Sequence, residues 1–370
     1  MRLIFLAPML ALGGQAAPPA LPVPPIVSTP PASAGTAPTR LLVAPRFGPA
    51  RCIGGDSPAL TLAPRLAVEA GWSGTNAPPV TLSFAIDATG RPHDIERRGQ
   101  GDYDGRFQAA LAVARFAPGV AKGCTISVTR QSYGLSEAPR ALAIEALFFG
   151  GVREPALIDA VFGGAPSNCR VVPSPRVTHF PEFNRLARTP GTASWTILGY
   201  DLDARGRVRG AKVEASSGDA ELDRAGLRAL GASRFQGPAR QGCLFRYSRG
   251  AGQPLAAPEK PPRTAFKLPG GCPEDIHARW LAPPRPRFPE AFRARHIEGW
   301  AVIGFDVAPW GQPGNARVLN AEPAAVFGEA AKAGIEQARL RVDGDGYRGC
   351  VEHVRFRIGE PGEPESARVD

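Results

Sequence analysis

The chain has 370 residues, of which 43% are hydrophobic, so it is long enough to fold into two or three domains. It carries 44 basic and 34 acidic residues, which gives a formal charge of +10 at neutral pH. The basic residues are scattered and aromatic residues do not alternate with them, so the composition excludes a concentrated basic stripe of the kind that binds nucleic acid.

The first residues have the pattern of an export signal. Arg2 supplies the positive charge, Leu3 to Leu12 form a short apolar run, and Gly14-Gln15-Ala16 is a small-x-small cleavage site. The run has about half of the ~20 residues that a membrane-spanning helix needs. We therefore predict a signal peptide at residues 1–16 and no stable membrane span after its removal. An uncleaved inner-membrane anchor is the alternative.

Proline-rich and polar stretches divide the rest of the chain. Residues 18–39 contain eight prolines, which favour an extended backbone and cannot build a core, so we predict a linker at 17–45. A second linker is predicted at 251–265, and a frayed tail rich in proline, glutamate and glycine at 360–370. A third boundary falls within 132–168, where residues 141–149 have the composition of a short helix.

Between these stretches one pattern occurs three times. An aromatic residue ends a strand-like run, and a glycine that suits a tight turn follows it. The three pairs are Phe84 and Gly90, Tyr200 and Gly206, and Phe305 and Gly311. The repeat predicts three small domains, at 46–135, 155–250 and 266–359.

Each copy has the same predicted order of strand, turn, strand, helix and strand. The first strands are rich in β-branched and aromatic residues, and apolar residues at helical spacing follow the second strands. Residues 216–219 supply turn and cap chemistry before the second helix. The clearest ranges are first strands at 194–203 and 302–307, second strands at 208–216 and 315–320, and last strands at 124–130, 243–248 and 350–358. We therefore predict an α+β fold, with a short antiparallel sheet packed on one or two helices in each domain.

The cysteines follow the same repeat. One precedes each aromatic–glycine pair at a nearly constant distance, and one follows it directly after a glycine. Six cysteines allow 15 pairings, and the repeat selects one of them: Cys52–Cys124, Cys169–Cys243 and Cys272–Cys350. Each bridge would stabilise its domain by about 4 kcal/mol in the chain-entropy model. Zinc sites need closely spaced ligands, so this spacing favours disulfides and an oxidising compartment.

The sequence shows no catalytic, metal or cofactor motif, and we predict no enzyme and no cofactor. The five histidines stand in unrelated contexts, although two lie near the cysteines of the third copy and are expected to approach each other. The histidines are His93, His179, His277, His296 and His353. No histidine has the nucleophile and orienting group that a catalytic site needs.

Other recurring residues leave their roles open. Each helix is followed by an arginine, and Arg115, Arg234 and Arg339 are suited equally to neutralising a carboxylate, covering apolar surface or binding a ligand. Trp300, at a strand start, is expected in the core. Trp310, in the turn before a glycine, is the better candidate for an exposed recognition residue.

In order, these elements resemble the C-terminal domain of TonB-type energy transducers. The third copy matches best over residues 287–358, and the first copy is the weakest. The third copy contributes Phe288-Pro289-Glu290, Gly299-Trp300, Phe305-Asp306-Val307 and Gly311; the second contributes Phe180-Pro181-Glu182, Ser216-Ser217-Gly218, Leu222-Asp223 and Arg234-Phe235; the first contributes Phe84, Gly90 and Arg115-Phe116-Ala117-Pro118.

The resemblance implies a periplasmic protein that captures a segment of an outer-membrane receptor by adding it as a strand to a sheet edge. We expect the partner to contact the third copy through its lead-in and its last strand. The predicted contact residues are Arg287, Phe288, Pro289, Glu290, Val351, His353, Arg355 and Arg357. Transducers of this family carry one such domain and a membrane helix. This chain departs from that pattern, because we predict three copies and no stable membrane span. The alternative is a disulfide-stapled scaffold of the cell envelope with no role in transport.

Overall fold

The computed structural model is a mixed α+β fold with several small antiparallel sheets, and it describes residues 39–55, 57–73, 78–99, 105–163, 167–359 and 366–369. The predicted signal peptide and most of the first linker lie outside these residues. The part of the chain from Thr39 onward forms one compact unit, in which every strand pairing is antiparallel apart from isolated bridges. No helix of the described residues is long and apolar enough to cross a membrane.

The first copy contains four strands and one helix. They are β4 (Val80–Ile86), β5 (Pro92–Arg98), α1 (Arg106–Val113), β6 (Arg115–Phe116) and β7 (Ala121–Gly134). The helix is almost entirely buried. Tyr103, the first residue of the apolar pattern that predicts this helix, lies outside the described residues.

The second copy repeats this order. It consists of β9 (Ser194–Leu202), β10 (Val208–Ser216), α4 (Ala220–Ala232), β11 (Arg234–Phe235) and β12 (Arg240–Arg249). The predicted cap is present, because the Asp219 side chain accepts a hydrogen bond of 3.0 Å from the backbone N–H of Leu222.

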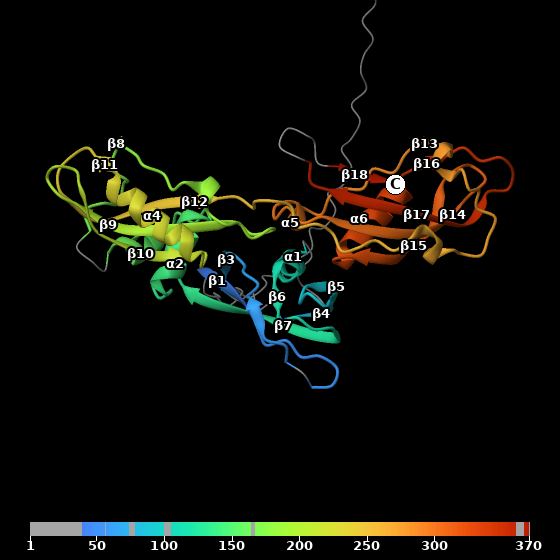
Figure 1. Ribbon diagram of the computed structural model, residues 1–370, viewed down its shortest axis with the longest axis horizontal. Coiled ribbons are helices and arrows are strands. Elements are labelled where there is room, and N and C mark those ends of the chain that lie inside the picture. Colours follow the sequence, from blue (N-terminus) through green and yellow to red (C-terminus); the bar gives the residue numbers. More distant parts are fainter. Residues whose placement is uncertain are drawn as a thin grey trace, which may run out of the picture. The chain divides into compact units, whose positions relative to one another are not determined.

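The third copy repeats it again. It consists of β14 (Gly299–Val307), β15 (Pro313–Glu322), α6 (Ala325–Glu336), β16 (Arg339–Leu340) and β17 (Tyr347–Arg357). In each copy the first strand lies between the other two long strands, in the orders β5-β4-β7, β10-β9-β12 and β15-β14-β17 (Figure 1). The predicted strands and helices are therefore confirmed, with ends that differ by a few residues.

Short strands complete each copy in the same way. A two-residue strand that begins two or three residues after each helix ends pairs with a strand from the segment that follows the first cysteine. These strands are β2 (Leu60–Leu62) on β6, β8 (Pro175–Val177) on β11 and β13 (Trp280–Ala282) on β16.

The turn glycines contact this short strand directly. The carbonyls of Gly90, Gly206 and Gly311 accept hydrogen bonds of 2.8 to 2.9 Å from the backbone N–H groups of Phe116, Phe235 and Leu340. All three glycines have φ between 69 and 83°, a region that other residues rarely adopt. A Cβ on any of them would lie within about 2 Å of a backbone oxygen, so the repeat requires glycine here.

The recurring arginines cap the ends of the helices. Arg115 donates to the carbonyls of Ala112, Val113 and Ala114 at 2.7 to 3.4 Å. Arg234 makes the same set of bonds at the end of α4, and Arg339 keeps one of them at the end of α6. A cation here satisfies carbonyls that the helix leaves unpaired. None of the three roles considered from the sequence is needed to explain these residues.

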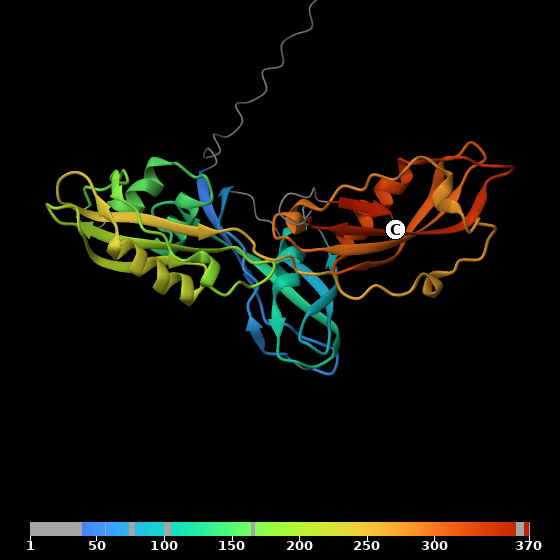
Figure 2. The same cartoon turned by 45° about the horizontal axis from the view of Figure 1, so that its top comes forward.

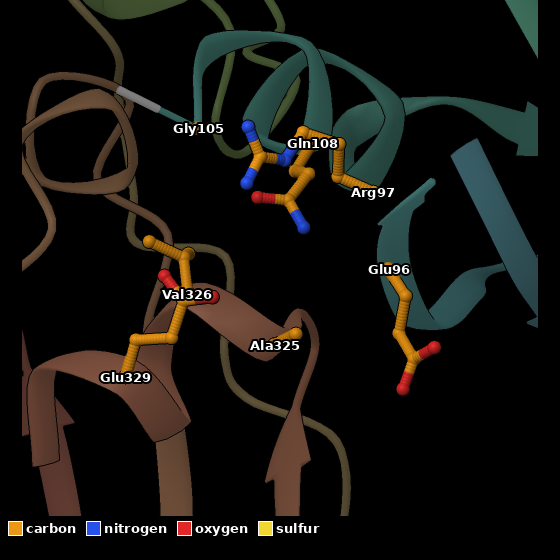
Figure 3. Close-up of a pocket in the computed structure, with 7 residues that line it drawn as sticks. All are labelled: Glu96, Arg97, Gly105, Gln108, Ala325, Val326 and Glu329. Carbon is orange, nitrogen blue, oxygen red and sulfur yellow. The ribbon is translucent and has the colours of Figure 1, made fainter. Parts of the chain in front are cut away.

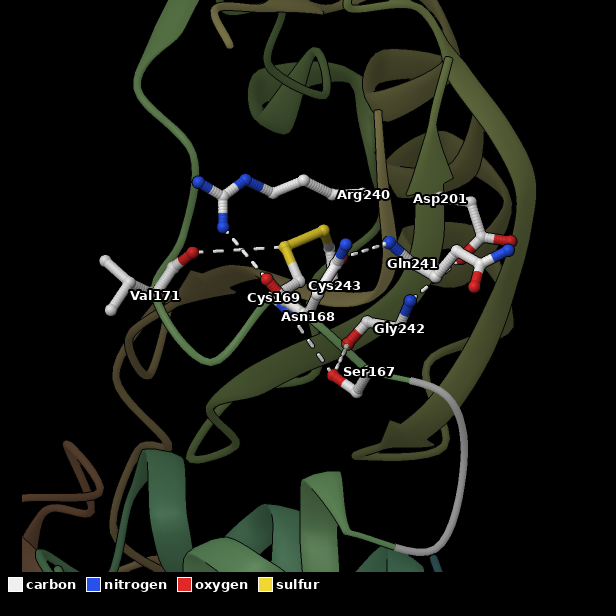
Figure 4. The surroundings of a disulfide bond; sticks show 9 residues. All are labelled: Ser167, Asn168, Cys169, Val171, Asp201, Arg240, Gln241, Gly242 and Cys243. Atoms are coloured by element: carbon white, nitrogen blue, oxygen red, sulfur yellow. Dashed lines mark hydrogen bonds between the residues drawn. A yellow bond between two sulfur atoms is a disulfide. The ribbon is translucent and has the colours of Figure 1, made fainter. Parts of the chain in front are cut away.

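The three disulfides join the cysteines that the repeat pairs: Cys52–Cys124, Cys169–Cys243 and Cys272–Cys350. Figure 4 shows the second bridge. Beside it, the backbone N–H of Gly242 donates to the Asp201 carboxylate at 2.8 Å, and Asn168 pairs with Gln241. In the third copy Gly349 donates to Asp306 in the same way, at 2.9 Å. The predicted disulfide pairing is confirmed.

The predicted linker at 17–45 is wrong over its last residues. Arg40–Phe47 form β1, which pairs with β7 and with β3 (Glu69–Trp72) to give the sheet order β3-β1-β7-β4-β5. Leu42 is fully buried in a core shared with α2 (Arg140–Phe148) and α3 (Pro155–Phe162). Leu42 and Ala44, which alternate along β1, are both buried, so this stretch belongs to the fold.

Helices α2 and α3 cover the second copy on the side opposite α4. Their apolar residues pack against Ile197, Ala215 and Leu244 of the second sheet, whereas α4 packs on the other face with Leu198 and Tyr200. Figure 2 shows the helices on the two sides of these strands. The short helix predicted at 141–149 corresponds to α2.

The predicted linker at 251–265 also folds onto the sheet. We call residues Leu255–Leu268 the strap, which includes the 3-10 helix η2 (Arg263–Phe266). Leu255 is buried and exchanges backbone hydrogen bonds with His296 and Glu298. The carbonyl of Pro258 accepts a bond of 2.9 Å from the Trp300 indole. The strap therefore covers the face of the third sheet opposite α6. The linker prediction is wrong because apolar residues of the strap pack against this sheet.

The end of the chain contradicts the prediction of a frayed tail. Ser366–Val369 form β18, which pairs antiparallel with Val354–Arg357 of β17. The third sheet therefore has the order β15-β14-β17-β18. The proline- and glutamate-rich composition of the tail does not extend to these last residues, which include Ala367 and Val369.

A glycine substitution tests the shared turn. Gly311→Ala would place its Cβ 2.0 Å from the Leu340 carbonyl oxygen at a φ of +83°. We expect the free energy of unfolding to fall by about 2–4 kcal/mol, from backbone strain and displacement of β16. Gly314→Ala is the control, because no atom lies within 4 Å of its Cβ position. Urea unfolding with the disulfides intact measures both, and equal stabilities would contradict this role.

Candidate functional site at the outer edge of β17

The first copy shows which backbone groups face the outer edge of a last strand. Thr125, next to Cys124, exchanges two backbone hydrogen bonds of 2.7 and 2.9 Å with Arg51 across that edge. Cys350 lies opposite Phe305 as Cys124 lies opposite Phe84. Because hydrogen-bonding direction alternates along a strand, the outward groups in the third copy belong to every second residue from Val351. These residues are Val351, His353, Arg355 and Arg357.

The side chains of these four residues share the face opposite α6. Cys350, Val354 and Phe356 point into the core that contains α6, so their neighbours point to the strap side. His353 is 2% exposed, and its ring lies edge-on to Phe266 of the strap at 6.0 Å. The exposed side chains of the set are those of Arg355 and Arg357, while Val351 is half-buried. The strap therefore blocks the His353 side chain from contacting a partner directly.

A shallow basic hollow lies beside this strand. It has a volume of about 280 Å³ and is bordered by the strap, by the start of β14 and by the end of β17. Its charged lining is Lys260, Arg355 and Arg357 against one acidic residue, Glu298. Glu298 accepts a hydrogen bond of 3.1 Å from the Ile358 backbone. The excess of positive charge suits an acidic segment laid along the strand.

The edge is partly occupied by the chain itself. β18 pairs with four residues of β17, from Val354 to Arg357, and Ala367 packs against the core. Val351 and His353 lie outside this pairing. The edge thus accepts an antiparallel strand, and a partner that uses its whole length has to replace β18.

The predicted lead-in contacts are divided between core and surface. Phe288 packs its ring against Phe356 at 5.6 Å and Phe327 at 6.0 Å, and Pro289 is buried at the start of α5 (Glu290–Arg293). These two residues hold the lead-in against β17 and α6. Arg287 and Glu290 are exposed. Hydrogen bonds from Arg293 lower the pKa of the Glu290 carboxyl.

A buried carboxylate on the other face of β17 is not evident from the sequence. Glu352 is fully buried, with one oxygen 3.3 Å from His277 Nδ1. His277 Nε2 lies 2.8 Å from Arg263 Nη1. A guanidinium only donates, so Nε2 accepts from Arg263. His277 therefore contacts Glu352, the neighbour of His353 along β17. No group of metal-binding side chains occurs in the described residues.

The two tryptophans of the third copy differ in their exposure to solvent. Trp300 is 3% exposed and belongs to the core, as expected. Trp310 is 75% exposed in the turn before Gly311. Its exposure agrees with the sequence-based choice, and its binding role stays a prediction.

A second feature joins the first and third copies. Glu322, at the end of β15, is buried, with Oε1 3.1 Å from His93 Nδ1 of β5 and Oε2 accepting from the Asp94 backbone at 2.8 Å. The adjacent Ile95 N–H donates to the Pro323 carbonyl at 3.0 Å. The hydrogen bond to Glu322 raises the pKa of the His93 imidazole.

The hollow beside this junction has mixed charge. Figure 3 shows side chains from β5, α1 and α6 around it, with Arg97 and Gln108 facing Val326 and Glu329. Its volume is about 140 Å³, and its lining includes Glu96 as well as Arg97. Its small volume and its charged lining of two carboxylates and one guanidinium make it a weaker candidate site than the β17 edge.

One comparison with known proteins identifies part of the chain. Residues 284–358 match the family model for the Gram-negative bacterial TonB protein C-terminal. The match covers α5 and the third copy, and the first and second copies lie outside it. No curated protein matches the chain. The match suggests a TonB-like envelope protein, and domains of the matched family are of a non-enzymatic interaction type.

The strength of the contact between His93 and Glu322 should depend on pH. The pKa of His93 is raised above its ordinary value of 6.5, so the pair contributes fully below about pH 6.5 and its contribution is lost as pH rises through the higher pKa of the folded state. We expect the Asp94 and Ile95 amides to exchange faster with solvent on the alkaline side, after correction for intrinsic exchange. His93→Gln should remove this dependence. An unchanged pH profile in that variant would contradict the assignment.

Proposed function

We propose that this protein works in the periplasm and binds an extended segment of an outer-membrane receptor, or of another envelope protein, by strand addition to the outer edge of β17. The observation that carries the proposal is the pairing of β18 with Val354–Arg357, because it supports the idea that the edge accepts an antiparallel strand. The family match over residues 284–358 supports the compartment and the class of partner.

Backbone hydrogen bonds would supply most of the affinity, and side chains the selectivity. The outward N–H and C=O groups of β17 can pair with any extended segment. The basic hollow lined by Lys260, Arg355 and Arg357 favours a segment with acidic residues. Exposed Arg287 and Glu290 lie in the lead-in, which Phe288 holds against the same strand. This division gives the predicted contact residues two roles, positioning and direct contact.

The three copies are proposed to be one domain repeated, at 46–135, 155–250 and 266–359. The recurring order of elements, the turn glycines and the capping arginines support this. A role in TonB-dependent transport is part of the same proposal. Its support is the family match to the third copy.

Competition with β18 would regulate this binding. A strand tethered by a short connection has an effective concentration on the order of millimolar. An external segment can use the whole edge only in molecules in which β18 is unpaired. Its apparent affinity is therefore its intrinsic affinity multiplied by the unpaired fraction. Its pairing of four residues is short enough for replacement by a longer strand.

The scaffold alternative is favoured by a specific observation. Long segments outside the repeats bind the sheets: β1 pairs with β7, and the strap covers the third sheet. Such coverage stabilises a fixed assembly, which is what a structural protein of the envelope needs. The two functions differ in whether the edge of β17 takes up external segments.

Removing the tail tests strand uptake. In a chain that ends at Gly359, we expect the amides of Arg355 and Arg357 to exchange faster, because their outer partners are gone. A synthetic peptide of residues 360–370 should restore protection at millimolar concentration. Arg355→Pro in the shortened chain should abolish this binding, because proline has no N–H, whereas Arg355→Ala should largely retain it. Binding that survives the proline would remove this edge from consideration.

Capture from outer-membrane extracts separates the two functions. The shortened chain should retain receptor proteins more strongly than the full chain, and Arg355→Pro should lose them. If neither chain retains receptors while the peptide of residues 360–370 still binds, the edge is functional but closed to receptors, and the scaffold alternative stands.

A further inference from the structure

The chain completes the outer edge of the last strand in two of its three copies. β1 pairs with β7 from Leu41 to Phe47, and β18 pairs with β17 from Val354 to Arg357, both in antiparallel orientation. Within the part of the chain that the structure describes, no strand lies on the corresponding side of β12, and the second sheet ends there. Among the described residues, a strand therefore pairs with this edge in the first and third copies and none does so in the second.

The backbone of β12 points outward at alternate residues. The Trp195 N–H donates to Ser217 Oγ at 2.9 Å and its carbonyl accepts from the Ser217 N–H at 2.8 Å, so both of its groups face the β10 side. Ser248 lies opposite Trp195, so the Ser248 N–H and C=O face the outer edge. By alternation the same holds for Arg246 and Leu244.

The start of the edge is already used. Asn168, beside the disulfide, donates its N–H to the Gln241 carbonyl at 3.3 Å and accepts from the Gln241 N–H at 2.8 Å (Figure 4). The Ser167 hydroxyl donates to the Gly242 carbonyl at 3.3 Å. The remaining edge, from Leu244 to Ser248, is long enough for three cross-strand positions.

An apolar hollow lies on one side of this remaining edge. It has a volume of about 230 Å³ and is formed by α2, α3, the residues after Cys169, and Leu244. Its apolar lining is Leu147, Phe148, Ile158, Phe162, Val172 and Leu244. Val172 is 48% exposed. A residue placed opposite Leu244 on an added strand would share its face and enter this hollow.

The next position on the same face is basic. Arg246 is exposed, with its guanidinium 5.2 Å above the Phe149 ring and Nη1 donating to the Phe148 carbonyl at 3.1 Å. These contacts hold the charge beside the edge. β12 carries three arginines and no acidic residue. Two copies of this strand paired with each other would bring arginines together, so the charge favours an acidic partner over a second copy.

We infer that the outer edge of β12 from Leu244 to Ser248 is a strand-acceptor site for an extended polypeptide segment with the pattern acidic–any–apolar. In an antiparallel strand the residue opposite Arg246 precedes the residue opposite Leu244 by two positions. The acidic residue then faces Arg246 and the apolar residue enters the hollow. The inference rests on the proposed strand-addition function, but uses a different edge, outside residues 284–358.

Selection from a phage-displayed library of random dodecapeptides on the immobilised full chain tests the site. We expect enriched sequences to contain Asp or Glu two residues before a large apolar residue. Their binding should weaken about tenfold or more with Arg246→Glu, which turns attraction into repulsion, and with Ser248→Pro, which removes an outward N–H. Arg228→Glu, an exposed charge reversal on α4, is the matched control and should leave binding unchanged.

The arms of the experiment separate this site from the β17 edge. Peptides that lose binding with Arg355→Pro but not with the β12 variants report β17 and overturn this inference while supporting the proposed function. Peptides that respond only to the β12 variants support it whatever happens at β17. Failure to enrich any sequence, or enrichment of basic sequences, overturns it. Circular dichroism checks folding, and if Ser248→Pro unfolds the chain, Arg246→Glu decides alone.

Discussion

The unpaired backbone groups of a short sheet are the constraint on which the rest of this structure depends. Each copy contributes only three long strands, so its last strand lies at an edge with N–H and C=O groups that need partners. β1 meets this need on β7, and β18 meets part of it on β17. On β12, within the part of the chain that the structure describes, Asn168 and Ser167 meet this need for Gln241 and Gly242.

The second face of each sheet adds a similar demand. One face of the second and third sheets packs on its own helix, and the other face needs cover from outside the repeat. The second copy obtains it from α2 and α3, and the third from the strap, where Leu268 lies over Gly304 and Pro258 accepts from Trp300. The segments between the copies are therefore parts of the fold, including the strap, most of which has a composition typical of a linker.

The features that the sequence predicts are local or repeated. Gly90, Gly206 and Gly311 are predictable because a tight turn requires positive φ, and Asp219 because a helix start requires a cap. The disulfides are predictable because the repeat aligns the cysteines. The roles of the capping arginines are not, since carbonyls at a helix end are visible only in three dimensions.

The features that the sequence misses depend on pairing between distant segments. β1 follows a proline-rich stretch, and nothing local shows that Leu42 meets α2 and α3. For the candidate site, the predicted contacts on β17 are alternate residues of one strand, and their binding role stays a prediction. The sequence could not show that Phe266 packs on His353, or that Ala367 lies at the edge and packs against the core, because both contacts depend on which segments meet in three dimensions. Periodicity reports one segment at a time, whereas burial depends on which segments meet.

The unequal covering of the three edges orders them by how easily each can be opened. β1 pairs with β7 along seven residues, carries the buried Leu42, and is followed closely by Cys52, whose disulfide joins the same chain segment to β7. Opening this edge would break many contacts while a covalent bond holds the two strands together. β18 pairs along four residues and lacks such a bond. The free energy needed to release it is smaller, because fewer hydrogen bonds and less apolar area are lost. At β12 no described strand has to leave. One repeated sheet therefore offers a closed edge, a replaceable edge and an open edge, and only the latter two suit a binding function.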